Sequence, residues 1–276
     1  MWCFINGDYQ LASDLRISPF DHGFLYGLGF FETFRTYQGQ PLFLQEHYAR
    51  LQQALATYRI AMPYTMEQLK DIVKELNQRE EGDGYFRLNV SAGEHDIGLK
   101  PQRYDEPNVI LFRKPLMLAP AHSEKTLTFL QTVRNQPEQQ QRFKSHHYGN
   151  NVLARFELPS LQQDEGVFVN HNGDVVEGVT SNIFWVKDGQ VYTPSLATGA
   201  LGGIMRQLIL QMTTVIEGEF KPTALLEADE IFITTAIQGL VPIKQLENNN
   251  YVGREGKVYQ QLFNAFEQVK KERQQC

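Results

Sequence analysis

Apolar and polar positions in the first half of the chain follow two spacings, one typical of strands and one typical of amphipathic helices. Strands are expected at residues 2–12, 30–37, 41–44, 85–92 and 108–112, and helices at residues 45–58 and 65–78. Asn6-Gly7 predicts a tight hairpin turn inside the first strand pattern. Thr65 followed by Gln68 matches a capping box at the start of the second helix. This mixture of elements predicts an α+β domain.

The second half of the chain carries a similar mixture with more strands. Strands are expected at residues 126–133, 166–170, 174–176, 181–186, 190–193 and 230–236, and helices at residues 204–214 and 257–273. Pro115 and Pro120 mark a crossover between the two halves. We therefore predict a smaller N-terminal α+β domain at residues 1–116, a linker at 117–124 and a larger, strand-rich C-terminal domain at 125–276.

Lys144 stands in a stretch of small, polar and aromatic residues that follows a glutamine-rich run. From about Tyr148 the apolar residues Val152, Leu153 and Phe156 take helical spacing, which places Lys144 at the mouth of an expected helix. A lysine there is either a solvated surface charge or a catalytic amine. The segment alone favours the surface charge, because lysine side chains are mostly exposed.

Composition narrows the class of protein. A net charge of -6 and a pI near 5.7 give no general electrostatic reason to bind nucleic acid or anionic lipid. Cys3 and Cys276 lie at opposite ends of the chain, without the spacing of a metal site or a disulfide framework, so we expect no metal and a reducing compartment. The chain shows neither a signal-peptide pattern nor a membrane-spanning apolar run, which predicts a cytoplasmic protein.

Three features of the second half gain meaning beside Lys144. Glu177 stands at the end of an expected strand, and Gly202-Gly203 opens an expected helix whose free N–H groups suit an anion. Residues 233–239 end a strand in hydroxyls and small side chains. A lysine amine, an acid and a phosphate cradle are the parts that a pyridoxal-phosphate enzyme requires. Each feature alone is weak evidence for such a site, since Glu177 is equally compatible with a surface acid and double glycines occur in many turns.

The order of these residues resembles the signature of the fold-type IV pyridoxal-phosphate enzymes. The resemblance runs through Glu177, Asn182-Ile-Phe, Val191-Tyr-Thr193 and Leu201-Gly-Gly-Ile-Met-Arg206, and also through Phe31-Glu32, Glu46-His47 with Arg50, Tyr85-Phe-Arg87 and Lys144-Ser. This family includes branched-chain aminotransferases, D-amino-acid aminotransferases and 4-amino-4-deoxychorismate lyases. Membership implies a two-domain fold like that of D-amino-acid aminotransferase, pyridoxal 5'-phosphate as cofactor and a homodimer.

The resemblance also implies roles for individual residues. Lys144 matches the lysine that forms a Schiff base with the cofactor, Glu177 the partner of the pyridine nitrogen, and Arg50 the phosphate-binding arginine. Backbone and hydroxyl groups match the rest of the phosphate cradle at Ile204, Met205, Thr235 and Ala236. With these matches Lys144 is interpreted as a catalytic amine, and retention of Lys144 with Glu177 argues against a non-catalytic relative.

Within the family the chain is most similar to bacterial aminodeoxychorismate lyases, which release pyruvate and form 4-aminobenzoate for folate. Strand alternation puts Phe31, Thr33 and Arg35 on one face. The resemblance places Phe31, Arg35 and Arg87 at the substrate, and gives Thr33 a part in protonating the leaving group. Guanidinium groups suit the carboxylates of a dicarboxylate substrate, but they suit 2-oxoglutarate equally well. An aminotransferase of D-amino acids or branched-chain amino acids is therefore the alternative.

Overall fold

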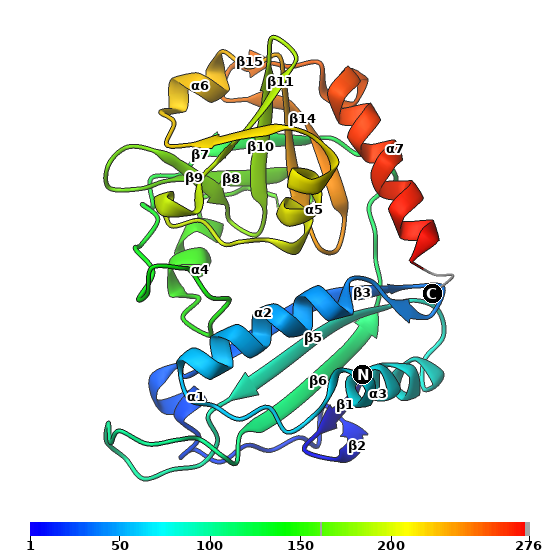
Figure 1. Cartoon of the computed structure of the whole chain (residues 1–276), viewed down its shortest axis with the longest axis vertical. Coiled ribbons are helices and arrows are strands. Elements are labelled where there is room, and N and C mark those ends of the chain that lie inside the picture. The colour runs from blue at the N-terminus through cyan, green and yellow to red at the C-terminus, as the bar shows by residue number, and fades with distance from the viewer. Residues whose placement is uncertain (161, 274–276) are drawn as a thin grey trace. The chain divides into compact units, whose positions relative to one another are not determined.

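The computed structural model describes residues 1–160 and 162–273, and the chain divides into two compact units (Figure 1). Unit 1 comprises Met1–Met117 together with Phe143–His147, and unit 2 comprises Leu118–Arg142 and the chain from Tyr148 onward. The predicted division gave residues 143–147 to the second domain, whereas the structure groups them with unit 1. Cys276 lies outside the described residues.

Unit 1 is built on a six-stranded antiparallel sheet with the strand order β2-β1-β6-β5-β3-β4. Its elements are β1 (Trp2–Ile5), β2 (Asp8–Leu11), α1 (His22–Tyr26), β3 (Gly29–Tyr37), β4 (Gln40–Pro41), α2 (Leu44–Thr57), α3 (Met66–Gln78), β5 (Gly84–Ser91) and β6 (Asn108–Pro115). The predicted hairpin is confirmed, because β1 and β2 pair across Asn6 and Gly7, which both have positive φ. The predicted capping box is confirmed as well, since Thr65 and Gln68 exchange side-chain and backbone hydrogen bonds.

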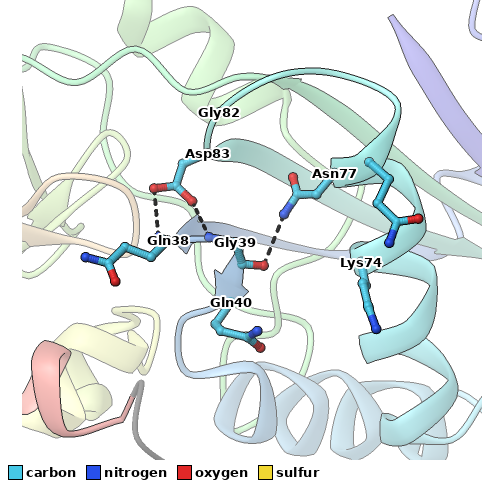
Figure 2. A pocket seen from close by; sticks show the side chains of 8 residues that line it. Gln38, Gly39, Gln40, Lys74, Asn77, Gly82 and Asp83 are labelled. Carbon is cyan, nitrogen blue, oxygen red and sulfur yellow. Dashed lines mark hydrogen bonds between the residues drawn. The ribbon is translucent and has the colours of Figure 1, made fainter.

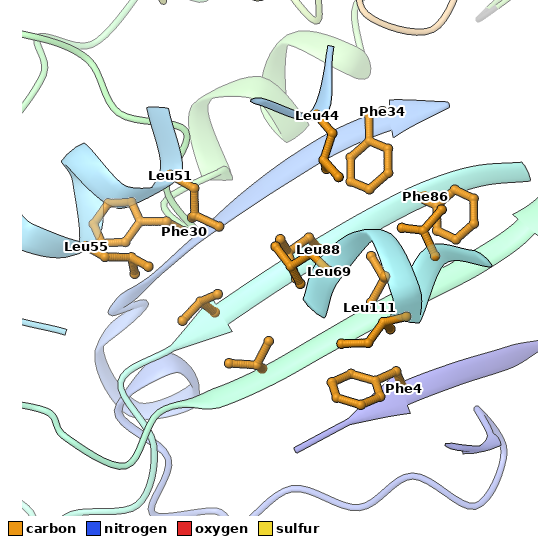
Figure 3. Packing of buried hydrophobic residues seen from close by; sticks show 14 of the residues in the cluster. Phe4, Phe30, Phe34, Leu44, Leu51, Leu55, Leu69, Phe86, Leu88 and Leu111 are labelled. Carbon is orange, nitrogen blue, oxygen red and sulfur yellow. The ribbon is translucent and has the colours of Figure 1, made fainter. Parts of the chain in front are cut away.

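The core of unit 1 lies between one face of this sheet and the helices α2 and α3. Figure 3 shows Leu51 of α2 and Leu69 of α3 packed over Leu88, Phe86 and Leu111 of the sheet. Along β5, Phe86 and Leu88 are buried whereas the alternate residues are only half-buried. The strand period of two therefore separates an apolar face, which packs on the helices, from a polar face on the other side.

The strand predicted at residues 41–44 is wrong. Strand β4 ends at Pro41, and Leu44 already begins α2. Phe43 precedes this helix with φ of 55°, a left-handed conformation that turns the chain into it. Leu42, Phe43 and Leu44 are all buried, and a short apolar run of this kind fits a strand and a helix start equally well.

Unit 2 is built on a nine-stranded mixed sheet, with β15 paired to β14 beside the main path β12-β11-β10-β13-β14-β7-β8-β9. Its elements are β7 (Lys125–Phe129), α4 (Gly149–Arg155), β8 (Asp164–Val169), β9 (Val175–Gly178), β10 (Asn182–Lys187), β11 (Gln190–Pro194), η1 (Leu196–Thr198), α5 (Ile204–Met212), β12 (Val215–Gly218), α6 (Pro222–Leu226), β13 (Glu230–Thr235), β14 (Gly239–Leu246), β15 (Asn249–Asn250), η2 (Gly253–Glu255) and α7 (Lys257–Glu272). The predicted α+β class, with a β-rich second half, is confirmed.

Helix α4 differs from the sequence interpretation in two ways. It begins at Gly149, while Lys144 lies earlier, in a segment that pairs with β3 rather than at the mouth of the helix. Val152, Leu153 and Phe156 are exposed, and the buried face carries Asn151 and Ala154 instead. The helix can bury an amide because Asn151 donates a 2.7 Å hydrogen bond to a backbone carbonyl of unit 2.

Candidate active site

A polar face of the unit 1 sheet collects the residues that the sequence assigned to the substrate. Strands β3 and β5 pair so that Thr33 lies opposite Arg87 and Arg35 opposite Tyr85. Directly opposed residues of an antiparallel pair point to the same face, so both predicted arginines share one surface with Thr33. Arg35 is buried, and Thr33 and Arg87 are half-buried. The predicted grouping of these side chains on one face is thus present in the structure.

Lys144 joins this face through a short strand-like segment. Phe30 and Ser145 form an antiparallel bridge, the Phe31 N–H donates to the Lys144 carbonyl at 2.9 Å, and the His146 N–H donates to the Gly29 carbonyl at 2.9 Å. The bridge puts Lys144 opposite Phe31, and therefore on the polar face. The lysine is held by β3 in unit 1 and is half-buried.

The ring of Phe31 connects the lysine to an arginine. Lys144 Nζ lies 4.6 Å from the centroid of this buried ring, and the guanidinium carbon of Arg87 lies 3.8 Å from it. Both are cation–π distances. Arg87 Nε also donates a 3.1 Å hydrogen bond to Asn89, which fixes the orientation of the guanidinium. One amine and one guanidinium therefore meet at a single aromatic ring.

Arg50, the predicted phosphate ligand, lies on α2 and pairs with Glu32 of β3. Its Nε donates to Glu32 Oε1 at 2.7 Å and its Nη2 to Oε2 at 2.6 Å, a bidentate pair. His47 Nδ1 lies 2.6 Å from the same Oε2. Burial by itself raises the pKa of the Glu32 carboxyl, but Arg50 and His47 outweigh it and lower that pKa to about 2. Glu32 thus holds Arg50 in place, a role that the sequence did not reveal.

In unit 2, Glu177 is a buried carboxylate with an arginine partner. Arg134 Nη2 lies 2.8 Å from Glu177 Oε1, and the Leu201 N–H donates to Oε2 at 2.9 Å. Arg134 is itself buried, stacks on Phe168 at 4.8 Å and donates to Asn151 at 3.0 Å. The alternative of a surface acid is therefore excluded for Glu177, because both members of the pair are shielded from water.

The predicted phosphate cradle begins where Gly203 starts helix α5. Among the residues that the structure describes, no side chain caps this helix at Gly203, and the buried Ile204 and Met205 follow. Asn182 lies beside the cap and donates from Nδ2 to the Leu201 carbonyl at 2.8 Å. The N–H and the carbonyl of Leu201 are therefore both held by side chains, the N–H by Glu177 and the carbonyl by Asn182.

The other part of the predicted cradle, Thr235 and Ala236, follows at the end of β13. The Thr235 hydroxyl accepts the N–H of Gln238 at 2.9 Å and so stabilises the turn before β14. Thr234, directly opposite Asn182 in the sheet, is buried and its hydroxyl makes no hydrogen bond within the described chain. A buried hydroxyl without a partner next to Asn182 leaves hydrogen-bonding capacity for a bound group.

The predicted site residues thus fall into two sets. Those of unit 1 are Lys144, Phe31, Thr33, Arg35, Arg87 and Arg50, and those of unit 2 are Glu177, Ile204, Met205, Thr235 and Ala236. The sequence missed Arg134, Glu32 and Asn182 as supporting residues. Asn182 and Glu32 were visible as residues of the family resemblance, although without these contacts, whereas Arg134 lies in no pattern that marks its partner.

A surface pocket of unit 1 does not contain the predicted site (Figure 2). It is lined by Gln38, Gly39, Gln40, Lys74, Asn77, Gln78, Gly82 and Asp83. Asp83 accepts the N–H groups of Gln38 and Gly39 at 2.9 Å each, and Asn77 donates to the Gly39 carbonyl at 3.2 Å. These bonds stabilise the turn between β3 and β4, so the polar groups of the pocket serve the fold.

Comparison with known proteins decides the family. The family model "Amino-transferase class IV" matches residues 29–246, which include Lys144, Glu177 and the start of α5. The chain belongs to the class IV aminotransferase family. Members of this family are pyridoxal-phosphate enzymes, and the chain is accordingly an enzyme of small-molecule metabolism. In the part of the chain that the structure describes, no helix has both the length and the apolar character to span a membrane.

Individual relatives refine the comparison. The chain is 40% identical to the aminodeoxychorismate lyase of Bacillus subtilis over 92% of this chain and 89% of that protein. It is 33% identical to a putative branched-chain-amino-acid aminotransferase of Methanocaldococcus jannaschii, over 95% of both chains. Among solved structures, 4-amino-4-deoxychorismate lyase from Pseudomonas aeruginosa superposes with a TM-score of 0.83 at 26% identity, over 95% of this chain and 97% of that chain.

The residues present in this class IV chain fit the cofactor of the family. Pyridoxal phosphate needs an amine, a carboxylate for its ring nitrogen and N–H or hydroxyl donors for its phosphate. Lys144 supplies a half-buried amine and Glu177 a buried carboxylate. The start of α5 and the Thr234 hydroxyl, which have no side-chain cap and no partner among the described residues, supply donors. Each requirement is met by a group of the matching chemistry.

Proposed function

We propose that this protein is a pyridoxal-phosphate-dependent lyase that converts 4-amino-4-deoxychorismate into 4-aminobenzoate and pyruvate. The observation that carries this proposal is the 40% identity with the aminodeoxychorismate lyase of Bacillus subtilis over nearly the whole length of both chains. The polar face of unit 1 supports it, since Arg35 and Arg87 offer two guanidinium groups to a substrate with two carboxylates.

We propose that Lys144 anchors the cofactor through Nζ, and that Glu177, Arg50 and the cradle residues Ile204, Met205, Thr235 and Ala236 bind its ring nitrogen and phosphate. When bound, the cofactor supplies an electron sink for the carbon that bears the substrate's amino group. The ion pair with Arg134 and the Leu201 N–H hold the Glu177 carboxylate in one orientation. The bidentate pair with Glu32 does the same for Arg50.

Once the substrate's amino group has released Lys144 Nζ, the free amine acts as the base of the proposed reaction. Its Nζ takes the proton from the carbon that bears the amino group, and the bond between the ring carbon and the enolpyruvyl oxygen breaks. The leaving group takes up a proton and is released as pyruvate, and the ring becomes aromatic. Thr33, on the polar face opposite Arg87, is the hydroxyl that we assign to this protonation. Phe31 supports the amine through its ring face.

The decisive experiment separates the lyase from an aminotransferase. The purified holoenzyme is incubated with aminodeoxychorismate alone, and separately with an amino donor and 2-oxoglutarate. Pyruvate and 4-aminobenzoate formed without an amino acceptor support the lyase. The 33% identity with a putative branched-chain aminotransferase supports the second candidate, transamination, which is favoured if product appears only in the presence of 2-oxoglutarate.

We further propose a cytoplasmic homodimer that binds neither nucleic acid nor membrane. Phe20 and Phe24 are 46% and 69% exposed in the single chain. Apolar rings of this size gain free energy when a second copy covers them. The net charge of -6 supports the proposal that the protein does not bind nucleic acid. Cys3 is buried as a free thiol, which is compatible with a reducing compartment.

A further inference from the structure

His146 lies on the polar face of unit 1 together with Lys144, and its side chain has no part in the proposed reaction. The bridge between Phe30 and Ser145 places His146 opposite Gly29, just as it places Lys144 opposite Phe31. A Cβ on Gly29 would lie 2.4 Å from His146 Nδ1, so the glycine leaves the space that the imidazole fills. The imidazole and Phe31 rings have centroids 6.2 Å apart.

Two nitrogen atoms on this face are buried without a hydrogen-bond partner in the described chain. One is His146 Nε2 and the other is Nδ2 of Asn89, which lies opposite Phe31 on β5. Asn89 uses its oxygen to accept from Arg87, and the guanidinium of Arg87 stacks on Phe31. A buried polar group without a partner costs about 1–3 kcal/mol, so a ligand that hydrogen-bonds to both nitrogens would remove this cost.

The charge of His146 decides which ligand suits the cluster. Burial, helped by the positive charge of Arg87, lowers the pKa of His146 to about 4 against the opposing effect of Asp21. The imidazole is therefore neutral near pH 7 and offers Nε2 as a directional donor in one tautomer. The Asn89 amide is a neutral donor too. Two neutral donors beside one guanidinium match the several lone pairs of a carboxylate.

We propose that His146 Nε2 and Asn89 Nδ2 donate hydrogen bonds to a substrate carboxylate that Arg87 pairs with, so that these residues set the preference for a dicarboxylate. This assignment rests on the proposed function for the identity of the substrate, but not for the chemistry of the subsite. His147 provides a matched comparison. It follows His146 directly, is exposed, and directs its own Nε2 to the Tyr26 carbonyl at 3.2 Å.

The test uses the holoenzyme and its variants His146→Phe, His146→Gln, Asn89→Leu and His147→Phe. Calorimetric titration with benzene-1,3-dicarboxylate measures binding without turnover, and KM for aminodeoxychorismate measures it during turnover. We expect His146→Phe and Asn89→Leu each to raise the dissociation constant of the dicarboxylate and the KM for aminodeoxychorismate by about tenfold, with little change in kcat. His146→Gln, whose amide nitrogen reaches the place of Nε2, should recover most of the loss, and His147→Phe should bind like the wild type.

Equal affinities for His146→Phe and His147→Phe would overturn the assignment, as would a failure of a folded His146→Gln to recover binding. A second measurement covers the case in which His146→Phe does not fold. In the wild-type holoenzyme, the imidazole nitrogen resonance that His146→Gln removes should shift when the dicarboxylate is added, and an unmoved resonance overturns the proposal. If the dicarboxylate binds in this way but aminodeoxychorismate is not turned over, the lyase function fails while the subsite stands.

Discussion

The side-chain oxygen of Asn182 lies so close to Gly203 that a Cβ built on this glycine would be 2.0 Å from it. The same amide donates to Leu201, whose N–H in turn binds Glu177. Glycine at position 203 therefore leaves the space that the Asn182 amide occupies, in addition to preceding the first residue of α5. A side chain at this position must displace the amide, and with it the Leu201 peptide.

Gly203→Ala should therefore weaken cofactor binding by about tenfold, because the start of α5 and the Leu201 peptide move together. Equilibrium dialysis of pyridoxal phosphate measures this loss. Gly202→Ala is the matched control, since a Cβ there would meet its nearest atom, Leu196 Cδ1, at an ordinary 3.6 Å. Equal losses in the two variants would show that Asn182 does not transmit the effect.

Lys144→Ala should abolish turnover together with the visible absorption of the lysine-bound cofactor, because Lys144 is the amine that we assign to the cofactor. Lys144→Arg should fail as well, although it keeps a cation on the Phe31 ring, since a guanidinium is not a nucleophile at neutral pH. Steady-state assays and absorption spectra of the purified variants provide the measurement. Residual turnover above a few per cent would place the catalytic amine elsewhere.

Glu177→Gln should leave the cofactor bound and lower kcat by roughly a hundredfold, because a neutral amide stabilises a protonated ring nitrogen poorly. The substitution keeps the shape of the side chain but leaves the buried Arg134 without its anion. We therefore also expect a lower melting temperature. Unchanged kinetics with full cofactor occupancy would remove Glu177 from the role of ring partner.

The ion pair of Glu32 and Arg50 predicts how the free energy of unfolding depends on pH in the acid range. The folded-state pKa of Glu32 is about 2, below the ordinary value of 4.5, so its contribution to stability is complete above pH 4.5 and is lost as the pH falls towards 2. The shift corresponds to on the order of 3 kcal/mol. Urea denaturation of the wild type and Glu32→Gln should give a stability difference that shrinks over this window, and a constant difference would contradict the assignment.

Light scattering at micromolar concentration measures the molecular mass and so tests the proposed dimer directly. A chain of 31.8 kDa should appear as an active species of about twice that mass. Phe24→Ser, which replaces a 69% exposed ring, should shift the equilibrium towards the monomer. A fully active monomeric wild type would exclude an obligate dimer.

The sequence predicted those parts of the fold whose signals are local. The Asn6-Gly7 hairpin, the Thr65 capping box and the common face of Thr33 and Arg35 on β3 follow from neighbouring residues, and the structure contains all three. Helix α4 was harder to predict because it buries Asn151 and the small Ala154, while its larger apolar residues Val152 and Leu153 are exposed. A periodicity argument assumes that the buried side is apolar, and α4 breaks that assumption.

The candidate site also has features that the sequence predicted and features that it did not. The motif made the position of Lys144 and Glu177 visible, but their partners come from distant parts of the chain. Arg134 reaches Glu177 across 43 positions of sequence, and no spacing rule marks such a pair. The place of His146 depends on a bridge to β3 that a single sequence does not encode in any local pattern.

The path of the backbone has a consequence for any attempt to divide the gene. Residues 143–147 return to unit 1 after the chain has entered unit 2, and they supply the hydrogen bonds that cover the edge of β3 at Gly29 and Phe31. A fragment ending at Met117 would contain the whole six-stranded sheet but neither Lys144 nor this cover. Its open strand edge would invite association with other chains. Unit 1 therefore consists of two separate segments of the chain, and Lys144 lies in the second of them.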